Sequence, residues 1–476
     1  MTLSMLILAL GVLVSVATRP TAGPETSPGT LVVTQVPVQA EPAPPGARLD
    51  PDRRYPAGSR IVVVPNTGRP GPVRVLSRGL ARAGAPDLSL DGRRVVFAGS
   101  RSPELGWTLF EAGISRRRPV QILRIEKDCT DPAYLPRGRI IFTCAGRGPE
   151  PRTWSLYTAT LGGRDLTRIT FGPGSAFDPT PLADGRILFA MLQRPGAGRP
   201  AAASALFTIN PDGTLLAPFA GSHTGPAWKV RPRQTQAGGV IFVTAAGTAG
   251  SGRLERVSMS RPLATRTTLV ATGVLSAEPA AAGGLLVAAR READAAGGSA
   301  LFRLSPGSAA VLEPLLDDPA YHEVEGLMAG TAMRVPARPS AVDLAARTGT
   351  LVCYDAGLTD GRYGGPGGKP LRLTAEMLPS RDGGDASVPL GEIPMAADGS
   401  FHIQVLADRA LRITAEHQDG RRETSGWFWV RPGEVRSCFG CHENRESAPP
   451  NRRVQAVAAT AVPLTGSGTG TPGAAP

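Results

Sequence analysis

A repeat in the middle of the chain constrains its fold more than any other feature of the sequence. In each copy a proline-containing segment leads through an Asp-Gly-type turn into an apolar strand, as in residues 86–97, 131–142 and 178–189. The prolines that mark five copies stand at positions 86, 132, 179, 226 and 279, in steps of 46, 47, 47 and 53 residues. Periods of about 40–50 residues with turn signals are typical of β-propeller blades. The repeat therefore predicts an all-β chain built around a propeller.

The number of blades follows from the strands that the five copies leave over. Each copy continues with a Leu-Phe or Leu-Tyr strand such as Leu109-Phe110, so four short strands make one blade. Residues 60–64 and 73–76 resemble two outer strands, and residues 322–328 could supply an inner strand. A sixth blade that shares strands from both ends would close the ring and remove its free edges. We predict six blades over residues 58–333, with five or seven as alternatives.

Composition and charge agree with a turn-rich β protein. Glycine and proline are abundant, with 58 and 46 residues, and aromatic residues make up only 5%. The net charge is +12, but its arginines are scattered through turns rather than massed in blocks. We therefore expect no nucleic-acid partner, although a diffuse positive surface could steer an acidic redox partner.

A chemical motif lies near the C-terminus, Cys438-Phe439-Gly440-Cys441-His442. The Cys-x-x-Cys-His pattern is typical of c-type haem attachment, in which Cys438 and Cys441 bond to the haem vinyl groups and His442 becomes the proximal iron ligand. The alternatives are a plain redox pair or half of a zinc site. A zinc site needs further ligands, and no second Cys pair or His cluster stands nearby in the sequence. We predict one covalent haem c, provided that the chain is exported.

The N-terminus indicates export. Residues 3–14 are an apolar run too short to span a bilayer comfortably, and Ser15-Val16-Ala17 is a small-x-small cleavage site. We predict a signal peptide over residues 1–17 and a periplasmic or otherwise extracytoplasmic protein. An uncleaved membrane anchor is the alternative. Residues 18–57 are rich in Pro, Ala, Thr and Gly without periodicity, which predicts a disordered tether.

The remaining cysteines fall in predicted strands. Cys129 and Cys144 flank a hairpin whose turn is Pro136-Arg137-Gly138, so they stand roughly opposite each other. In an oxidising compartment this arrangement predicts a disulfide, and two ordinary buried residues are the alternative. Cys353 is predicted to be a buried strand residue.

The repeat stops at a Pro/Arg linker, and a different kind of β structure follows. Apolar alternation resumes around residues 349–352, 371–373, 401–405 and 411–414, and residues 426–430 suggest a last strand. We predict a small β-sandwich-like domain over residues 334–453 that carries the haem motif, followed by a disordered tail over residues 454–476.

This third region carries a family likeness. The segments 337–343, 348–353, 390–401 and 429–434, together with the haem motif and Glu443-Asn444-Arg445, resemble the C-terminal region of hydrazine synthase alpha-subunit-like proteins. The resemblance implies a TolB-like propeller followed by a haem-bearing domain. Members of that family have an additional N-terminal domain with the active-site haem, whereas this sequence has one Cys-x-x-Cys-His motif and a predicted disordered tether in that place. The resemblance therefore favours the architecture and the haem, and argues against hydrazine synthesis by this chain alone.

A haem that only transfers electrons needs a second axial ligand, usually His or Met. His402 stands in the middle of a strand of the haem-bearing domain, on the face opposite Phe401 and Ile403, and is our candidate distal ligand. His223, His322, His417, Met377 and Met395 are weaker candidates, and an open sixth position is the alternative. Trp427 and Trp429 could wall the haem, and Arg436 and Arg445 could pair with its propionates; ordinary packing and surface positions are the alternatives.

The sequence shows no catalytic triad, carboxylate pair or metal cluster. The leading hypothesis is an exported monohaem cytochrome-like protein whose propeller docks a redox partner and whose haem relays electrons. Two other functions stay open: an oxidoreductase subunit that acts on a small nitrogen compound, and a haem-free TolB-like binding propeller.

Overall fold

Four-stranded antiparallel sheets account for most of the fold. The computed structural model describes residues 29–464, except 45–46, 66–70, 116–117, 147–151, 194–202, 222–226, 247–250, 292–297, 308–310, 331–332, 359–367, 381–385 and 441–450. The second strand of each repeat is rich in Val, Ile and Phe, which suit a pleated and buried surface. These apolar strands are buried almost throughout, and they form the interior of the sheets.

Three of the sheets follow the chain directly, and a fourth combines two sets of strands. The three sheets are β4 (Arg82–Leu88), β5 (Arg94–Ser100), β6 (Thr108–Gly113) and β7 (Val120–Gln121); β8 (Lys127–Leu135), β9 (Arg139–Gly146), β10 (Ser155–Thr160) and β11 (Thr167–Arg168); and β12 (Ala176–Pro181), β13 (Ile187–Gln193), β14 (Ala203–Ile209) and β15 (Ala217–Ala220). The seven-stranded sheet contains β16 (Ala227–Gln234), β17 (Gly239–Ala246), β18 (Gly252–Ser258), β19 (Thr267–Pro279), β20 (Leu285–Arg290), β21 (Ser299–Leu304) and β22 (Leu312–Leu316). Because the long β19 pairs with β18 through its first part and β20 through its last, this sheet holds two four-stranded units.

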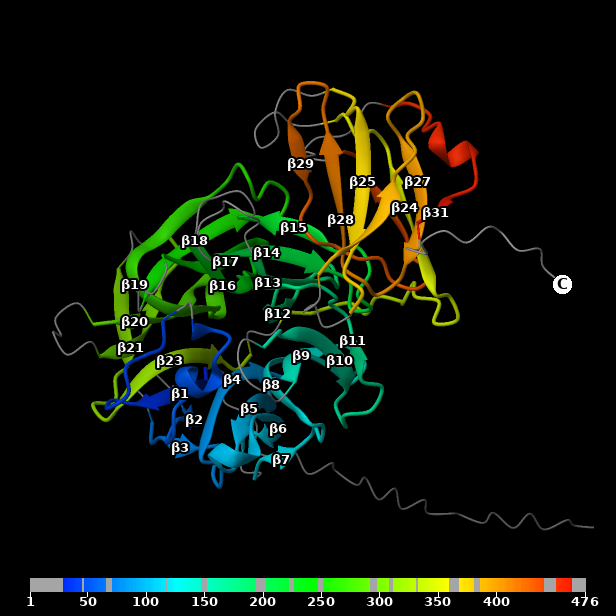
Figure 1. Ribbon diagram of the computed structural model, residues 1–476. Coiled ribbons are helices and arrows are strands. Elements are labelled where there is room, and N and C mark those ends of the chain that lie inside the picture. The colour runs from blue at the N-terminus through cyan, green and yellow to red at the C-terminus, as the bar shows by residue number, and fades with distance from the viewer. Residues whose placement is uncertain are drawn as a thin grey trace, which may run out of the picture.

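Strands from both ends of the repeat region form the closing sheet. Its order is β23 (Tyr321–Met328), β1 (Leu31–Pro37), β2 (Arg60–Val64) and β3 (Arg74–Val75). The first strands of successive units contact one another in chain order, and β23 contacts β4, so the ring is closed. Figure 1 shows these sheets around a common centre. The predicted mostly-β fold of repeated four-stranded sheets is confirmed, and the ring is consistent with a propeller of six blades; we call residues 31–328 the propeller.

The predicted disordered tether over residues 18–57 is wrong for its described second half. Residues 31–36 are buried in β1, which pairs with both β2 and β23. The short helix α1 (Pro51–Arg54) begins at Asp50, whose side chain accepts hydrogen bonds from the backbone N–H groups of Asp52 and Arg53. The segment is ordered because β1 supplies the second strand of the closing sheet. Residues 1–28, which include the predicted signal peptide, lie outside the described residues.

The C-terminal domain consists of two four-stranded sheets packed face to face. One has the order β30 (Val435–Cys438), β24 (Thr348–Cys353), β27 (Phe401–Leu406), β31 (Val462–Leu464), and the other β26 (Val388–Glu392), β25 (Arg372–Met377), β28 (Leu411–Glu416), β29 (Arg422–Thr424). Alternate residues of both sheets form one core, which includes Leu351, Phe401 and Leu411. This arrangement matches the predicted sandwich, seen beside the propeller in Figure 1.

Two local predictions in this domain fail. Residues 426–430 do not form a strand, because only Phe428 makes a bridge, to Leu411. The tail is ordered as far as residue 464, where β31 adds to β27 in parallel.

The 3-10 helices of the described chain are η2 (Pro103–Leu105), η3 (Ala281–Gly283) and η4 (Ala456–Ala458). Among the described residues, no helix is long and apolar enough to cross a membrane.

Candidate functional site

The centre of the propeller is occupied by the segment between β1 and β2. From this segment, the Arg54 guanidinium donates to Asp131 on β8 at 2.8 Å, and Arg48 Nε donates to Asp178 on β12 at 3.1 Å. Tyr55 donates from its hydroxyl to Glu325 on β23. All six side chains are buried. The segment that the sequence predicts to be disordered therefore fills the propeller centre with paired charges.

A third arginine, Arg231 on β16, completes this central ion-pair network by pairing with Glu325. Burial alone would raise the pKa of Asp131 and Glu325, but the neighbouring arginines hold both pKa values below their ordinary range. Burial, together with the nearby Arg231 and Arg54, lowers the pKa of Arg48. The network balances three guanidinium groups against three carboxylates, which indicates a structural rather than a catalytic role.

The network residues that lie on the first strands of the units share a backbone feature. Ala85, Asp131, Asp178 and Arg231 have φ between 48° and 53°. Each lies at a register shift in the first strand of its unit. A bulge at this position breaks the alternation of the strand, and non-glycine residues adopt this left-handed conformation at a cost. Ion pairs offset that cost at three of the four positions.

A cavity of about 120 Å³ lies among the same inner strands, under the linker to the C-terminal domain. Its lining includes Asp87, Tyr134, Arg233 and Glu278. Arg233 Nε donates to Glu278 at 2.7 and 2.8 Å. Burial raises the pKa of Asp87 to about 6, although the Tyr134 N–H donates to it. The cavity sets these charged and polar groups among apolar residues such as Leu327 and Met333, and no pattern in the sequence indicated it.

The predicted haem motif begins at an edge strand of the C-terminal domain. Cys438 ends β30, which pairs in parallel with β24 and places Cys438 directly beside Cys353. Cys353 is buried, as predicted, and Cys438 packs against the same core. Cys441 and His442 lie outside the described residues. No group of three or more His, Cys, Asp or Glu side chains within the described ranges could hold a metal ion.

The described start of the motif fits a covalently attached haem. Cys438 is half-buried at the end of the edge strand β30. Phe439 is 44% exposed and packs edge-on against Tyr354, with ring centroids 6.4 Å apart. At Gly440 a Cβ atom would lie 2.3 Å from the Leu358 carbonyl oxygen, so the chain turns where only glycine fits. A half-buried thiol beside two aromatic rings at a sheet edge is compatible with the predicted haem attachment, which stays a prediction.

His402 lies on the other face of the same sheet. It stands in register with Val352 and, across β24, with Ser437, whereas Cys438 shares its row with Cys353 and Phe401. Its Nδ1 atom lies 3.0 Å from the Ala459 carbonyl oxygen. Because a carbonyl only accepts, this contact requires a proton on Nδ1 and leaves the lone pair of a neutral ring on Nε2. The assignment of His402 as distal ligand stays a prediction.

The weaker ligand candidates are distributed over both domains. His322 is buried in β23 of the propeller, where it accepts from the Ser299 N–H. Met377 is buried at the end of β25, and Met395 packs against the sandwich core. His417 lies 3.6 Å from Glu423 beside a turn. His223 and Arg445 lie outside the described residues.

Trp429 and Arg436 do not have the predicted haem-facing roles. Trp429 is buried in a propeller core cluster, packs edge-on against Phe171 and donates from Nε1 to the Gly213 carbonyl at 3.2 Å. Arg436 donates to the carbonyls of Leu216 and Trp429. Both side chains join the two domains, because the propeller surface offers them an apolar cluster and free carbonyls. Trp427 instead lies under the Arg412 guanidinium, 4.6 Å from it.

The segment that follows Trp429 completes the domain contact. Arg431 lies over the Phe171 ring at 4.9 Å and donates to Asp408 at 2.7 Å. Glu434 accepts from the backbone N–H groups of Leu215 and Arg431 at 2.8 and 2.7 Å. Burial raises the pKa of Glu434 despite these donors. The segment 429–434, which carries part of the family likeness, therefore fixes the haem-motif domain to the propeller.

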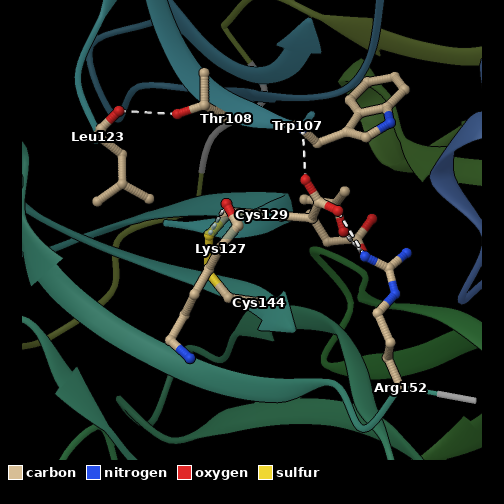
Figure 2. The surroundings of a disulfide bond; sticks show 10 residues. Trp107, Thr108, Leu123, Lys127, Cys129, Cys144 and Arg152 are labelled. Atoms are coloured by element: carbon tan, nitrogen blue, oxygen red, sulfur yellow. Dashed lines mark hydrogen bonds and ion pairs between the residues drawn. A yellow bond between two sulfur atoms is a disulfide. The ribbon is translucent and has the colours of Figure 1, made fainter. Parts of the chain in front are cut away.

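Cys129 and Cys144 form a disulfide between β8 and β9. The two residues are direct register partners, with Cα atoms 4.2 Å apart. Figure 2 shows the bond close to Lys127, Trp107 and Arg152. Asp128, the neighbour of Cys129, accepts from the Trp107 backbone N–H at 2.9 Å and from Arg152. The disulfide thus lies inside a network that joins two neighbouring sheets.

Taken together, fold and site define a mostly-β protein in which a propeller-like ring carries a sandwich domain with a haem-type motif. Residues 381–443 match the family described as hydrazine synthase alpha subunit middle domain. The structure is similar to Kuenenia stuttgartiensis hydrazine synthase, with 18% identity and a TM-score of 0.77, over 91% of this chain and 72% of that chain. The predicted resemblance to hydrazine synthase alpha-subunit-like proteins is confirmed by these two findings.

Other comparisons add less. TolB from Acinetobacter baumannii is matched at 12% identity and a TM-score of 0.46, over 63% of this chain and 66% of that chain. No curated protein matches the sequence. The matched family segment includes Cys438, Cys441 and His442.

Proposed function

We propose that this chain is an extracytoplasmic monohaem c-type protein that passes electrons to or from a partner protein. The observation that carries the proposal is the Cys-x-x-Cys-His motif directly after an accessible edge strand, in a domain fixed to a large propeller. Cys438 and Cys441 would hold the haem and His442 would be its proximal ligand. The haem would supply one-electron transfer, which the side chains of this chain do not provide.

The protein supplies position for that chemistry. The parallel pairing of β30 with β24 fixes Cys438 in the sheet, and the Tyr354 N–H donates to its carbonyl at 2.9 Å. The contacts of Trp429, Arg431 and Glu434 hold the domain against the propeller. A partner bound to the propeller would therefore stand at a fixed distance from the motif.

An extracytoplasmic location is supported by two independent features. The apolar run and small-x-small site at the N-terminus have the form of a signal peptide. The Cys129–Cys144 disulfide suits an oxidising compartment, because cytosolic thiols are normally kept reduced.

The test is to export the full chain in cells that attach c-type haem and to stain a denaturing gel for haem peroxidase activity. Wild-type protein should retain haem on the gel, and Cys438→Ser with Cys441→Ser should not. A matched control, Cys129→Ser with Cys144→Ser, should keep the haem because that pair lies in the propeller. An unstained wild-type band would overturn the proposal.

The distal ligand has its own test. If His402 is the second ligand, His402→Ala should change the spectrum of the oxidised protein from low-spin to high-spin and permit carbon monoxide binding. His417→Ala is the matched control and should leave the spectrum unchanged. Identical spectra for His402→Ala and wild type would remove His402 from the site and leave it as an anchor of the tail through Ala459.

Two alternative functions have supporting observations. The name of the similar structure, hydrazine synthase, favours an oxidoreductase subunit acting on a small nitrogen compound. The cavity lined by Asp87, Arg233 and Glu278 favours a haem-free binding propeller. Carbon monoxide binding by the wild-type haem would support the first, and a haem-free exported protein would support the second.

A further inference from the structure

The structure places Cys353 beside the first cysteine of the haem motif. The two residues are 85 positions apart in the sequence, yet they are direct partners in the parallel pairing of β24 with β30. Residues that stand opposite each other in a sheet direct their side chains to the same face. Burial agrees with this, because Cys353 lies in the sandwich core and Cys438 packs against it.

The spacing suits a disulfide. Neighbouring strands lie about 4.7–4.9 Å apart, within the range of about 4.4–6.8 Å that Cα atoms span across a disulfide. The same chain bonds one directly opposite pair, Cys129 and Cys144 in antiparallel strands, whereas Cys353 and Cys438 are not bonded to each other in the structure. The β30 strand is at the edge of its sheet, so it can shift slightly without breaking a second ladder.

We propose that Cys353 and Cys438 form a reversible disulfide, and that this bond competes with haem attachment at Cys438. The competition rests on the proposed function, whereas the disulfide itself does not. The bond forms by thiol–disulfide exchange with an oxidised oxidoreductase. The Cys353–Cys438 S–S bond forms, the S–S bond of the oxidoreductase breaks, and two electrons and two protons pass to the oxidoreductase, which becomes a dithiol. A reduced dithiol reverses the exchange.

Haem attachment at the same sulfur is a different reaction. The Cys438 thiol adds across a vinyl double bond, so an S–C bond forms, the π bond breaks and the thiol proton moves to the other vinyl carbon, with no net oxidation. A sulfur bonded to Cys353 has no thiol to add. The chain would thus accept haem at Cys438 only after a reductant has opened the Cys353–Cys438 bond.

The first experiment maps the disulfides of the full chain exported without haem-attachment machinery. Thiols are alkylated without reduction, and the protein is digested and analysed by mass spectrometry. The expected result is a Cys353–Cys438 linked peptide beside the Cys129–Cys144 peptide, which serves as an internal control. Alkylated Cys353, or Cys438 linked to Cys441, would overturn the proposal.

The second experiment measures haem per chain in cells that attach haem. Cys353→Ala should raise the haem content above wild type, and wild type should reach the same content when a reducing dithiol is added to the culture. The Cys129–Cys144 peptide in the variant checks that it folds. Equal haem contents in wild type and variant overturn the competition. If neither wild type nor Cys353→Ala contains haem, the proposed function and the proposed competition are both overturned. The peptide map still tests independently whether the Cys353–Cys438 disulfide forms.

Discussion

The centre of the propeller and the edge of the C-terminal sheet differ in how their reactive groups are held. In the centre, Arg48, Arg54 and Arg231 pair with Asp131, Asp178 and Glu325, and all six side chains are buried or nearly so. At the edge, half-buried Cys438 stands beside exposed Phe439. This difference shows that a dense set of ionisable groups does not by itself indicate a reactive site, because each charge in the propeller centre has an ionic partner.

The largest expected effect breaks the central ion-pair network. Arg54→Ala leaves Asp131 buried with one of its two arginine partners removed, which should lower the free energy of unfolding by about 3–5 kcal/mol. Denaturant unfolding followed by fluorescence measures this. Arg53→Ala is the matched control, because the adjacent Arg53 is exposed, and it should change stability by less than about 0.5 kcal/mol. Equal effects of the two substitutions would contradict a structural network.

The next effect tests the contact between the two regions. Trp429→Ala removes a buried ring from the propeller cluster and should cost about 3 kcal/mol of stability. We expect the thermal transition of the C-terminal domain to separate from that of the propeller in calorimetry. Trp427→Ala, at a half-buried position beside Arg412, should leave the transitions together. A single unchanged transition in Trp429→Ala would show that the domains do not depend on this contact.

The last prediction concerns Glu323 on β23 and the pH dependence of stability. Burial raises the pKa of Glu323 to about 8, and its Oε2 has no hydrogen-bond partner among the described residues. A carboxyl group with a raised folded pKa favours the folded state fully below its unfolded pKa, near 4.5, and this contribution is lost as pH rises through about 8.

Glu323→Gln should therefore remove the part of the stability loss that occurs between about pH 4.5 and 8. Urea unfolding at several pH values measures it. Glu313→Gln, at an exposed position of β22, is the control and should retain the wild-type pH dependence. A wild-type pH profile in Glu323→Gln would show that Glu323 is ionised in the folded protein. Glu325 behaves oppositely, because arginines lower its pKa.

The repeat made most of the propeller predictable from local pattern. The turn and apolar strand of each copy became the first hairpin of a unit, and residues 322–328 supplied the expected inner strand. The β1 strand was missed because Leu31–Pro37 stands within a Pro- and Ala-rich stretch whose composition suggests disorder, although Val32 and Val33 are typical strand residues.

The site was harder to predict because its contacts are distant in sequence. Arg48 donates to Asp178, which lies 130 residues later in the sequence, and Tyr55 donates to Glu325, which lies 270 residues later. No local pattern reports such pairs. The alternation at Trp427 and Trp429 predicted a strand, but the propeller draws Trp429 into its own core and interrupts the sheet. The Cys-x-x-Cys-His motif can be recognised in the sequence alone because the spacing expected for haem attachment depends on one macrocycle rather than on the fold, and its role stays a prediction.

The pairing of β1 with β23 also dictates the order in which the protein can fold. Leu31 pairs with Met328, so this contact closes a loop of nearly the whole propeller and must form late. Because β2 follows β1 closely in the sequence, β1 can pair on one side early, but its other edge has no partner strand until β23 is synthesised. An unpaired strand edge of this kind is prone to aggregation. The pairing of β1 with β23 therefore leaves one strand edge open until the last strand of the propeller has been synthesised.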